Sequence, residues 1–465
     1  MPVSSAVSTA AGLEITTLRR ALVDGSLSAS ELLVQVLDRI ARWDDPALWI
    51  ARVDESAVRE RAAALDACAR AEPELIEKLS LFGIPFAVKD NIDVAGMPTT
   101  AACPAFAYTP ARSAAVVDRL LAAGAVLVGK TNLDQFATGL VGTRSPYGVP
   151  RNPFDKRYIP GGSSSGSAVA VAAGLVSFAL GTDTAGSGRV PAAFNNLVGL
   201  KPTHGLLSAR GVVPACRSLD CVSVFALTAV DAAAVLEVAA GFDPEDPLSR
   251  PKPTEARETF GPNFRFGVPA AHDLEFFGDH QAEALFGAAI SILEKAGGSA
   301  AEICFAPFRD AGGLLYDGPW VAERLHATEQ LLVENPEALL PVTRAIIEHG
   351  RSYSALDVFR TQYQLAALRR QAERELANVD CMLLPTTGTI YKIAAIAADP
   401  VSLNSNLGLY TNFANLLDLS AVALPAGFRS NGLPFGISLL APAFAERPLL
   451  DLATRFSHSA AARRG

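Results

Sequence analysis

Residues 161–189 read GGSSSGSAVAVAAGLVSFALGTDTAGSGR and contain two glycine-rich loops with hydroxyl side chains. The first loop runs from Gly161 to Ser167 and the second from Gly181 to Gly188, and the apolar run between them fits one helix and one strand. Glycines allow positive φ and a close approach of backbone N–H groups to a ligand, as an oxyanion-binding turn requires. One such cluster is typical of a tight turn. Two clusters joined by a buried segment indicate a serine-based active site.

Upstream of these loops, residues 82–90 predict a short apolar strand that ends on a lysine, Lys89. A lysine at such a position is ordinarily a surface residue whose aliphatic stem packs against the fold. A serine hydroxyl, however, needs an adjacent base, and a desolvated neutral lysine can serve where histidine is absent. Lys89 is therefore our candidate base.

The rest of the chain alternates between helical and strand patterns. Ser28 and Glu31 have the spacing of a capping box, and apolar residues follow at helical intervals, so we expect a helix over 29–42. Further helices are predicted at 55–72, 113–123, from near 132, and at 168–173, 279–296, 319–333, 355–378 and 447–458. Strands are predicted at 82–90, 125–128, 175–180, 264–268, 300–305, 381–385, 420–424 and 436–440. This alternation predicts an α/β fold.

Composition narrows the classes of function. The 465 residues are 50% hydrophobic and 19% charged, with a net charge of −8, which predicts a globular protein with a large core. No run of Lys and Arg exceeds two residues, so we expect a small-molecule substrate and neither a nucleic-acid nor a membrane partner. The six cysteines and six histidines lack metal-ligand spacing, and the N-terminus lacks a signal-peptide pattern. We expect no metal, no cofactor and a cytoplasmic location.

Two sequence patterns point to other chemistries. Residues 124–131 match the phosphate-binding pattern G-x-x-x-x-G-K-T, but four apolar residues fill the variable positions and predict a buried strand instead of a phosphate-binding loop. Residues 162–166 match G-x-S-x-G, the nucleophile turn of α/β-hydrolases, but no apolar strand precedes them. We disfavour both interpretations, although histidines later in the chain leave the second one open.

Three short segments together resemble the signature of the amidase signature family. They are Val-Lys-Asp at Lys89, Gly-Gly-Ser-Ser at Ser163 and Gly-Thr-Asp-Thr-Ala-Gly-Ser at Ser187. The resemblance implies the amidase signature fold, a large mixed β-sheet sandwiched between layers of α-helices, and a Ser-cisSer-Lys triad. Matched position by position, Ser187 is the nucleophile, Ser163 the bridging serine and Lys89 the base that receives the proton.

The turn that carries Ser187 also supplies a candidate oxyanion hole. Its donors are expected to be the backbone N–H groups of Thr184, Ala185, Gly186 and Ser187. We expect Asp183 and Arg189 to hold this loop by hydrogen bonds, and Ser164 to support the proton relay.

Within the family, segments 184–196 and 213–221 resemble allophanate hydrolases. Allophanate is a urea that carries an N-carboxylate, so its enzyme needs a cationic group for that carboxylate. The resemblance places this group at Arg324, with Tyr316 beside it, because guanidinium meets carboxylate in bidentate geometry. Thr138 and Gly139 are further candidates, for contacts to the urea nitrogens.

The local sequence around Arg324 leaves one alternative open. An exposed helix arginine paired with a neighbouring acid such as Glu323 is the ordinary arrangement. We also expect Asp317 to cap a helix that begins near Pro319, which sets Tyr316 just before the helix and Arg324 inside it.

These features predict an amidohydrolase that releases ammonia from allophanate through a Ser187 acyl-enzyme. The alternatives are a general amidase or the amidase-type chain of a tRNA-dependent amidotransferase, and, in another class, a catalytically inactive binding protein. We expect one amidase domain over 1–465 with a helical N-terminal region at about 10–75. The resemblance further implies that a C-terminal domain common in allophanate hydrolases is absent. A homodimer is one possible oligomeric state, on which the sequence does not decide.

Overall fold

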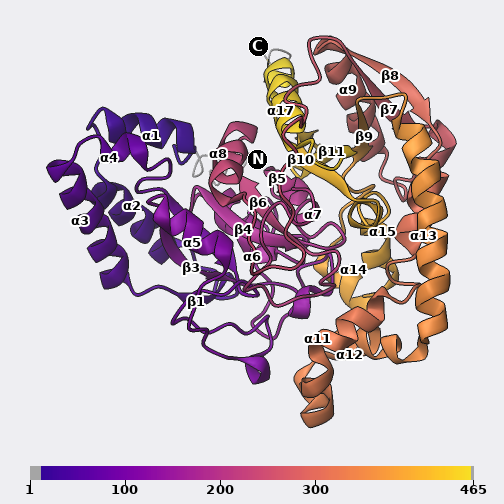
Figure 1. The fold of residues 1–465 in the computed structure, drawn as a ribbon, viewed down its shortest axis with the longest axis horizontal. Coiled ribbons are helices and arrows are strands. Elements are labelled where there is room, and N and C mark those ends of the chain that lie inside the picture. Colours follow the sequence, from indigo (N-terminus) through magenta and orange to yellow (C-terminus); the bar gives the residue numbers. More distant parts are fainter. Residues whose placement is uncertain (1–11, 462–465) are drawn as a thin grey trace.

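The computed structural model describes residues 12–461 and contains one 11-stranded mixed sheet flanked by helices (Figure 1). The strand order is β1-β3-β2-β4-β6-β5-β10-β11-β9-β7-β8. The strands are β1 (Trp49–Arg52), β2 (Pro85–Lys89), β3 (Val126–Thr131), β4 (Phe178–Asp183), β5 (Val198–Lys201), β6 (Cys221–Ala226), β7 (Phe264–Pro269), β8 (Gly298–Ile303), β9 (Cys381–Pro385), β10 (Leu419–Phe428) and β11 (Pro434–Pro442).

The helices cover the sheet and build a helical region beside it. They are α1 (Ile15–Val23), α2 (Ala29–Arg42), α3 (Glu55–Ala71), α4 (Leu75–Lys78), α5 (Ala115–Ala122), α6 (Ser165–Ala172), α7 (Val190–Phe194), α8 (Ala229–Ala239), α9 (His280–Lys295), α10 (Ala306–Gly313), α11 (Trp320–Glu334), α12 (Pro341–Glu348), α13 (Ala355–Leu376), α14 (Ile393–Ala398), α15 (Ser402–Leu407), α16 (Phe413–Leu416) and α17 (Glu446–Ala461). The predicted α/β sandwich is confirmed.

The middle of the sheet's first half is parallel and completely buried. Strand β2 pairs in parallel with β3 on one side and with β4 on the other, and every residue of these three strands is buried. Parallel strands that are covered on both faces have nearly continuous apolar sequences. The apolar residues that fill the phosphate-loop pattern therefore favour a buried strand, which the structure has at Val126–Thr131. Helix α6 packs on this part of the sheet.

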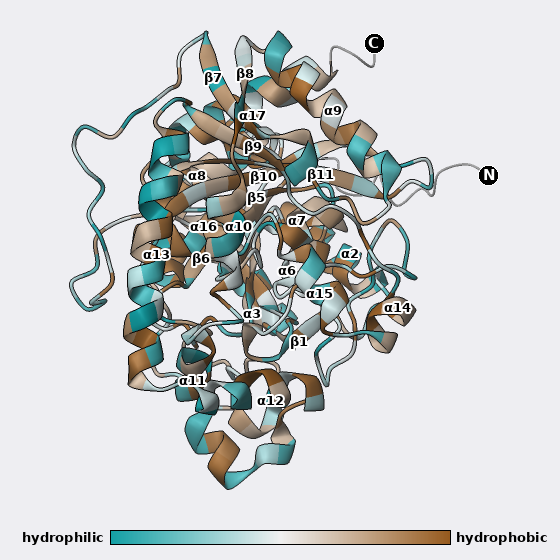
Figure 2. Ribbon diagram, turned by 90° about the vertical axis from the view of Figure 1, so that its right-hand side faces the viewer, coloured by the Kyte–Doolittle hydropathy of each residue, from teal (hydrophilic) through white to brown (hydrophobic). Residues whose placement is uncertain are grey.

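The outer helices are amphipathic and the strands apolar, as the hydropathy colouring of Figure 2 shows along α13 and on β9 and β10. Helix α17 packs on α8 and α9 and on strands β10 and β11 of the sheet's other half. In the described part of the chain, no helix is both long and apolar enough to cross a membrane.

The N-terminal region is helical with one exception. Helix α2 begins at the predicted capping box, in which the Ser28 hydroxyl accepts the Glu31 N–H at 3.1 Å and the Glu31 carboxylate accepts the Ser28 N–H at 2.8 Å. Between α2 and α3, strand β1 extends the sheet edge by pairing with β3. This four-residue strand, like β5 and β6, was missing from the sequence prediction.

Two local predictions were wrong. In place of the helix expected from near Asn132, the structure has one 3-10 turn over Gln135–Ala137, with Phe136 at a φ of +50°. The Asn132 side chain accepts the adjacent Leu133 N–H at 2.8 Å, and such local bonds between a short polar side chain and the backbone compete with helix formation. Helix α11 begins after Pro319 and has no side-chain cap, so Asp317 does not cap it.

Candidate active site

Lys89 stands at the carboxyl end of β2 and is completely buried. Its Nζ donates to Ser163 Oγ at 2.8 Å and to Thr182 Oγ1 at 2.7 Å. Both acceptors are neutral hydroxyls, so the ammonium form of Lys89 has no carboxylate in direct contact to stabilise it. The structure thus brings the predicted base and the predicted bridging serine together.

The surroundings of Lys89 favour its neutral form. Burial lowers the pKa of Lys89 to about 7, and the carboxylates of Asp134, Asp220 and Asp183 oppose this effect from a distance. A lysine that titrates near neutrality can accept a proton at physiological pH, which an ordinary surface lysine cannot.

Ser163 lies in the first glycine-rich loop, directly before α6, and follows a cis peptide bond between Gly162 and Ser163. Its carbonyl accepts the Asp134 N–H at 3.0 Å. A Cβ at Gly162 would collide with the Asp134 carboxylate and with the Gly142 N–H, so the tight approach requires glycine. The prediction that a glycine in this loop allows a close approach of the backbone therefore agrees with the structure at Gly162.

Ser187 lies in the second loop, which follows β4 and is held by a buried ion pair. Asp183 accepts the N–H groups of Gly186 at 2.9 Å and Gly188 at 3.0 Å, and Arg189 Nε donates to it at 2.9 Å. These contacts agree with the structural role predicted for Asp183 and Arg189. The Ser187 side chain is 2% exposed, and its hydroxyl forms no hydrogen bond within the described residues.

The same hydrogen bonds reduce the set of candidate N–H donors for the oxyanion hole. The Gly186 N–H points to Asp183 inside the loop and is therefore engaged. The N–H groups of Thr184, Ala185 and Ser187 have no acceptor among the hydrogen bonds of the described residues. We retain these three as the candidate donors and drop Gly186.

Two residues that the sequence analysis missed or left vague connect the loops. Ser164 Oγ donates to the Thr182 carbonyl at 3.1 Å and accepts the Thr182 N–H at 3.3 Å. Thr182 also accepts from Lys89, so it ties the base to the strand that leads to Ser187. Sequence reasoning had only the position of Thr182 next to Asp183 to go on, because the parallel pairing of β2 with β4 is what brings its hydroxyl within 2.7 Å of Lys89 Nζ.

Arg324 is buried on α11, with 2% of its surface exposed. Its Nη1 donates to Thr138 Oγ1 at 3.2 Å, its Nη2 lies 3.4 Å from the Tyr316 hydroxyl, and its guanidinium lies over the Tyr316 ring. Neighbouring Glu323 instead accepts from Ser218 at 2.8 and 2.6 Å. The alternative of an exposed arginine paired with Glu323 is therefore wrong.

The Arg324 guanidinium is only partly satisfied. Its Nε is buried and has no partner within the described residues. Burial lowers the pKa of Arg324, but its neighbours, among them Asp220 and Glu323, raise it above the usual value, so the charge is offset at a distance while Nε still lacks an acceptor. A buried donor without a partner costs free energy unless a ligand or water satisfies it. The structure brings Arg324 together with Tyr316, as predicted, and also with Thr138, for which contacts to the urea nitrogens were predicted. We call these three residues the carboxylate site, after the role predicted for Arg324.

Gly139 follows Thr138 in a loop that Asp134 holds. The Asp134 carboxylate accepts the N–H groups of Gly142 at 2.9 Å and Arg144 at 2.8 Å. A Cβ on Gly139, whose φ is +154°, would lie 2.8 Å from Asp134 Oδ2. Asp134 was missed by the sequence analysis, since a lone aspartate in a predicted helix carries no signal.

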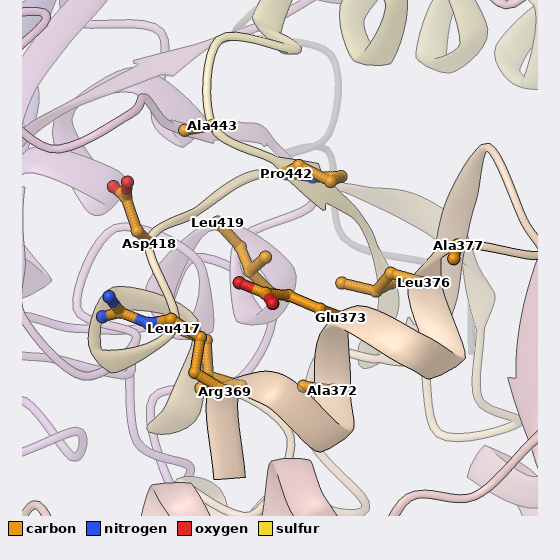
Figure 3. A pocket seen from close by; sticks show the side chains of 10 residues that line it. All are labelled: Arg369, Ala372, Glu373, Leu376, Ala377, Leu417, Asp418, Leu419, Pro442 and Ala443. Atoms are coloured by element: carbon orange, nitrogen blue, oxygen red, sulfur yellow. The ribbon is translucent and has the colours of Figure 1, made fainter. Parts of the chain in front are cut away.

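A surface pocket of about 430 Å³ lies between α13 and strands β10 and β11 (Figure 3). Its lining contains none of the predicted site residues; it consists of Arg369, Ala372, Glu373, Leu376, Ala377, Leu417, Asp418, Leu419, Pro442 and Ala443.

A fully buried lysine that donates to a loop serine at the carboxyl end of a parallel strand fits an amide hydrolase of the α/β class. Comparison with known proteins agrees. The Amidase family model matches residues 31–450, and the chain belongs to this family.

Three relatives show the range of similarity. Urea amidolyase of Saccharomyces cerevisiae is 49% identical over 383 residues, which are 82% of this chain and 21% of that protein. The crystal structure of Kluyveromyces lactis allophanate hydrolase superimposes with a TM-score of 0.90 at 42% identity, covering 96% of this chain and 72% of that one. The glutamyl-tRNA(Gln) amidotransferase chain of Synechococcus is 36% identical over 96% of this chain and 97% of its own length. The chain thus spans about a fifth of the urea amidolyases that it matches.

Proposed function

We propose that the chain hydrolyses allophanate, releasing ammonia and leaving N-carboxycarbamate. The observation that carries this proposal is the buried, incompletely paired Arg324 in the carboxylate site. A guanidinium in this state fits a substrate that ends in a carboxylate. The likeness to urea amidolyase and allophanate hydrolase supports the same substrate.

In the proposed reaction, neutral Lys89 draws a proton from Ser163, which in turn takes the proton of Ser187. The Ser187 oxygen forms a bond to the terminal carbonyl carbon, and the N–H groups of Thr184, Ala185 and Ser187 stabilise the resulting oxyanion. The carbon–nitrogen bond breaks as the relayed proton passes to the leaving nitrogen, which departs as ammonia. Water then attacks the acyl-enzyme by the same relay and regenerates Ser187.

The link between Lys89 and Ser163 is present as a 2.8 Å hydrogen bond. The second link, from Ser163 to Ser187, is a proposal, because Ser187 makes no hydrogen bond in the described residues. Catalytic hydrogen bonds often tighten only when substrate is bound.

Biuret provides a matched test, because it is allophanate with an uncharged carboxamide in place of the carboxylate. We expect the purified chain to release ammonia from allophanate with a kcat/KM about 100-fold above that for biuret, since the buried charge pair is lost with biuret. Arg324→Met should remove most of this preference by lowering kcat/KM for allophanate alone. Arg370→Met, at an exposed arginine of α13, is the control and should change neither value.

Absence of ammonia release from allophanate, together with rapid cleavage of another amide, would contradict the substrate. The similarity to the amidotransferase chain over nearly the full length of both proteins favours one second candidate, release of ammonia from glutamine. Glutamine and a partner protein therefore belong in the same substrate panel.

A further inference from the structure

Arg144 is a buried arginine to which the proposed reaction gives no role. Its side chain is 3% exposed and lies beside the carboxylate site, within electrostatic reach of Tyr316 and Arg324. Its Nη1 donates to the Thr138 carbonyl at 2.9 Å and its Nη2 to the Pro400 carbonyl at 2.5 Å. The buried Asp134 carboxylate offsets its charge, but both hydrogen bonds of its guanidinium go to backbone carbonyls, so Arg144 fixes the positions of those carbonyls.

Two arginines hold Thr138 through different atoms. Arg144 binds its carbonyl, and Arg324 binds its side-chain hydroxyl at 3.2 Å. The Arg144 backbone N–H is in turn fixed by Asp134 at 2.8 Å, and the Asp134 N–H donates to the Ser163 carbonyl at 3.0 Å. A continuous chain of contacts therefore runs from the proposed proton relay to the carboxylate site.

Fixing the Thr138 carbonyl also fixes the next N–H group. In a trans peptide the C=O and the following N–H point in opposite directions, so the Gly139 N–H points away from Arg144 Nη1. This N–H has no acceptor within the described residues. A buried donor without a partner costs free energy unless a ligand or water satisfies it. Arg144 also packs closely on Gly139, since a Cβ there would lie 3.2 Å from Arg144 Cδ.

We propose that Arg144 is a positioning residue for the substrate: it orients the peptide between Thr138 and Gly139 so that the Gly139 N–H donates to a substrate oxygen. The proposal rests on the proposed function for the identity of the substrate. Allophanate and biuret both carry an acceptor oxygen on the carbon beyond the central nitrogen, so Arg144 serves both. Arg324, in contrast, distinguishes the charged from the uncharged substrate.

Steady-state kinetics of Arg144→Met and Arg144→Lys with allophanate and biuret test this role. Misplacing a group that positions the substrate commonly costs about 100-fold in rate. We expect Arg144→Met to lower kcat/KM by about 10- to 100-fold, by a similar factor for both substrates. Lysine keeps the charge but lacks the planar fork that reaches two carbonyls. The decrease in log(kcat/KM) of Arg144→Lys relative to wild type should therefore be more than half of the decrease in Arg144→Met.

Labelling of Ser187 by a small fluorophosphonate separates positioning from misfolding. Its rate should stay within about threefold of wild type in both variants, because the relay residues are not altered, and Arg370→Met is again the control. Three results would overturn the proposal: unchanged kinetics, a loss restricted to allophanate, or full rescue by lysine. If Arg144→Met fails to fold, the milder Arg144→Lys decides.

Failure of the proposed function gives a different pattern. The wild-type chain would then leave allophanate intact, while the comparison of Arg144→Met with wild type would still be made on biuret or on another small amide that the chain cleaves. An equal proportional loss on that amide would support the positioning role without the substrate assignment.

Discussion

Lys89 and Lys130 are both fully buried on adjacent strands, and their partners give them different chemistry. Lys130 Nζ lies 3.0 Å from the Asp90 carboxylate and donates to the Thr99 hydroxyl at 2.7 Å. Burial lowers the pKa of Lys130, but the Asp90 carboxylate acts in the opposite direction. Lys89 has only hydroxyl groups in contact. We therefore assign the base to Lys89 and a structural ion pair to Lys130.

This assignment predicts a pH dependence. Since the base must be neutral and burial sets the pKa of Lys89 to about 7, kcat/KM should rise about tenfold per pH unit below that value and level off above it. The carboxylate of the substrate is ionised throughout this range and adds no slope. A rate profile between about pH 5.5 and 9.5 measures the effect, and a flat profile would contradict Lys89 as the base.

Lys89→Met is the companion variant and should lose nearly all turnover. Because the pKa of Lys89 is lowered from 10.5 to about 7 by folding, the unfolded chain binds the proton more tightly between these values. The unfolding free energy of the wild type therefore increases with pH across this window, by about 1.4 kcal/mol per unit relative to Lys89→Met. Denaturant titrations at several pH values would show whether the difference between the two proteins changes as predicted.

At the scale of elements, the strand ends of β2 and β4 create the site. Their parallel pairing puts Lys89 and Thr182 at one edge, and the loop after β4 then carries Ser187. The Asp183–Arg189 pair fixes that loop without reaching the solvent, since both side chains are fully buried. Stability and nucleophile placement thus depend on the same ion pair.

Asp183→Asn should be strongly destabilising. It leaves the Arg189 guanidinium without its counter-charge in the interior, which typically costs about 3–5 kcal/mol. The remaining amide cannot accept all of the bonds from Gly186, Gly188 and Arg189. The matched control is Asp357→Asn in the exposed capping box of α13, where a loss of about 1 kcal/mol or less is expected. Equal losses in chemical denaturation would show that burial of the pair is unimportant.

The sequence was informative where the local pattern determines the structure. The capping box at Ser28, the helix that follows it and the glycine-rich turns around Ser163 and Ser187 depend on neighbours within a few residues. Strand β1 was missed because four residues at a sheet edge have too short a pattern. Asp134 and Arg144 could not be predicted, since their partners become neighbours only through the strand order and the loop between Asn132 and Ser145.

At the scale of the whole molecule, the proposed site draws on distant parts of one continuous sheet. The base comes from β2, the nucleophile from the loop after β4, and Arg324 of the carboxylate site from α11. The side chain of Thr411, from the second half of the chain, packs against Gly186, and the Arg189 guanidinium donates to the Thr411 carbonyl at 3.0 Å. The pairing of β5 with β10 joins the two halves of the sheet. Folding of both halves is therefore needed to place Ser187.

This arrangement predicts that the isolated chain turns over allophanate without another polypeptide. Every group in the proposed reaction belongs to this chain and lies on strand β2, on helix α11 or in the loops next to β4 and α6. The specific activity should be constant over about a 100-fold dilution, the range in which a weak complex dissociates. Activity that falls with dilution, or that appears only with a second protein and with glutamine, would instead favour the amidotransferase interpretation. The two experiments separate these outcomes. If the chain must associate with itself, raising its concentration alone restores activity, whereas a requirement for a second protein is met only by adding that protein.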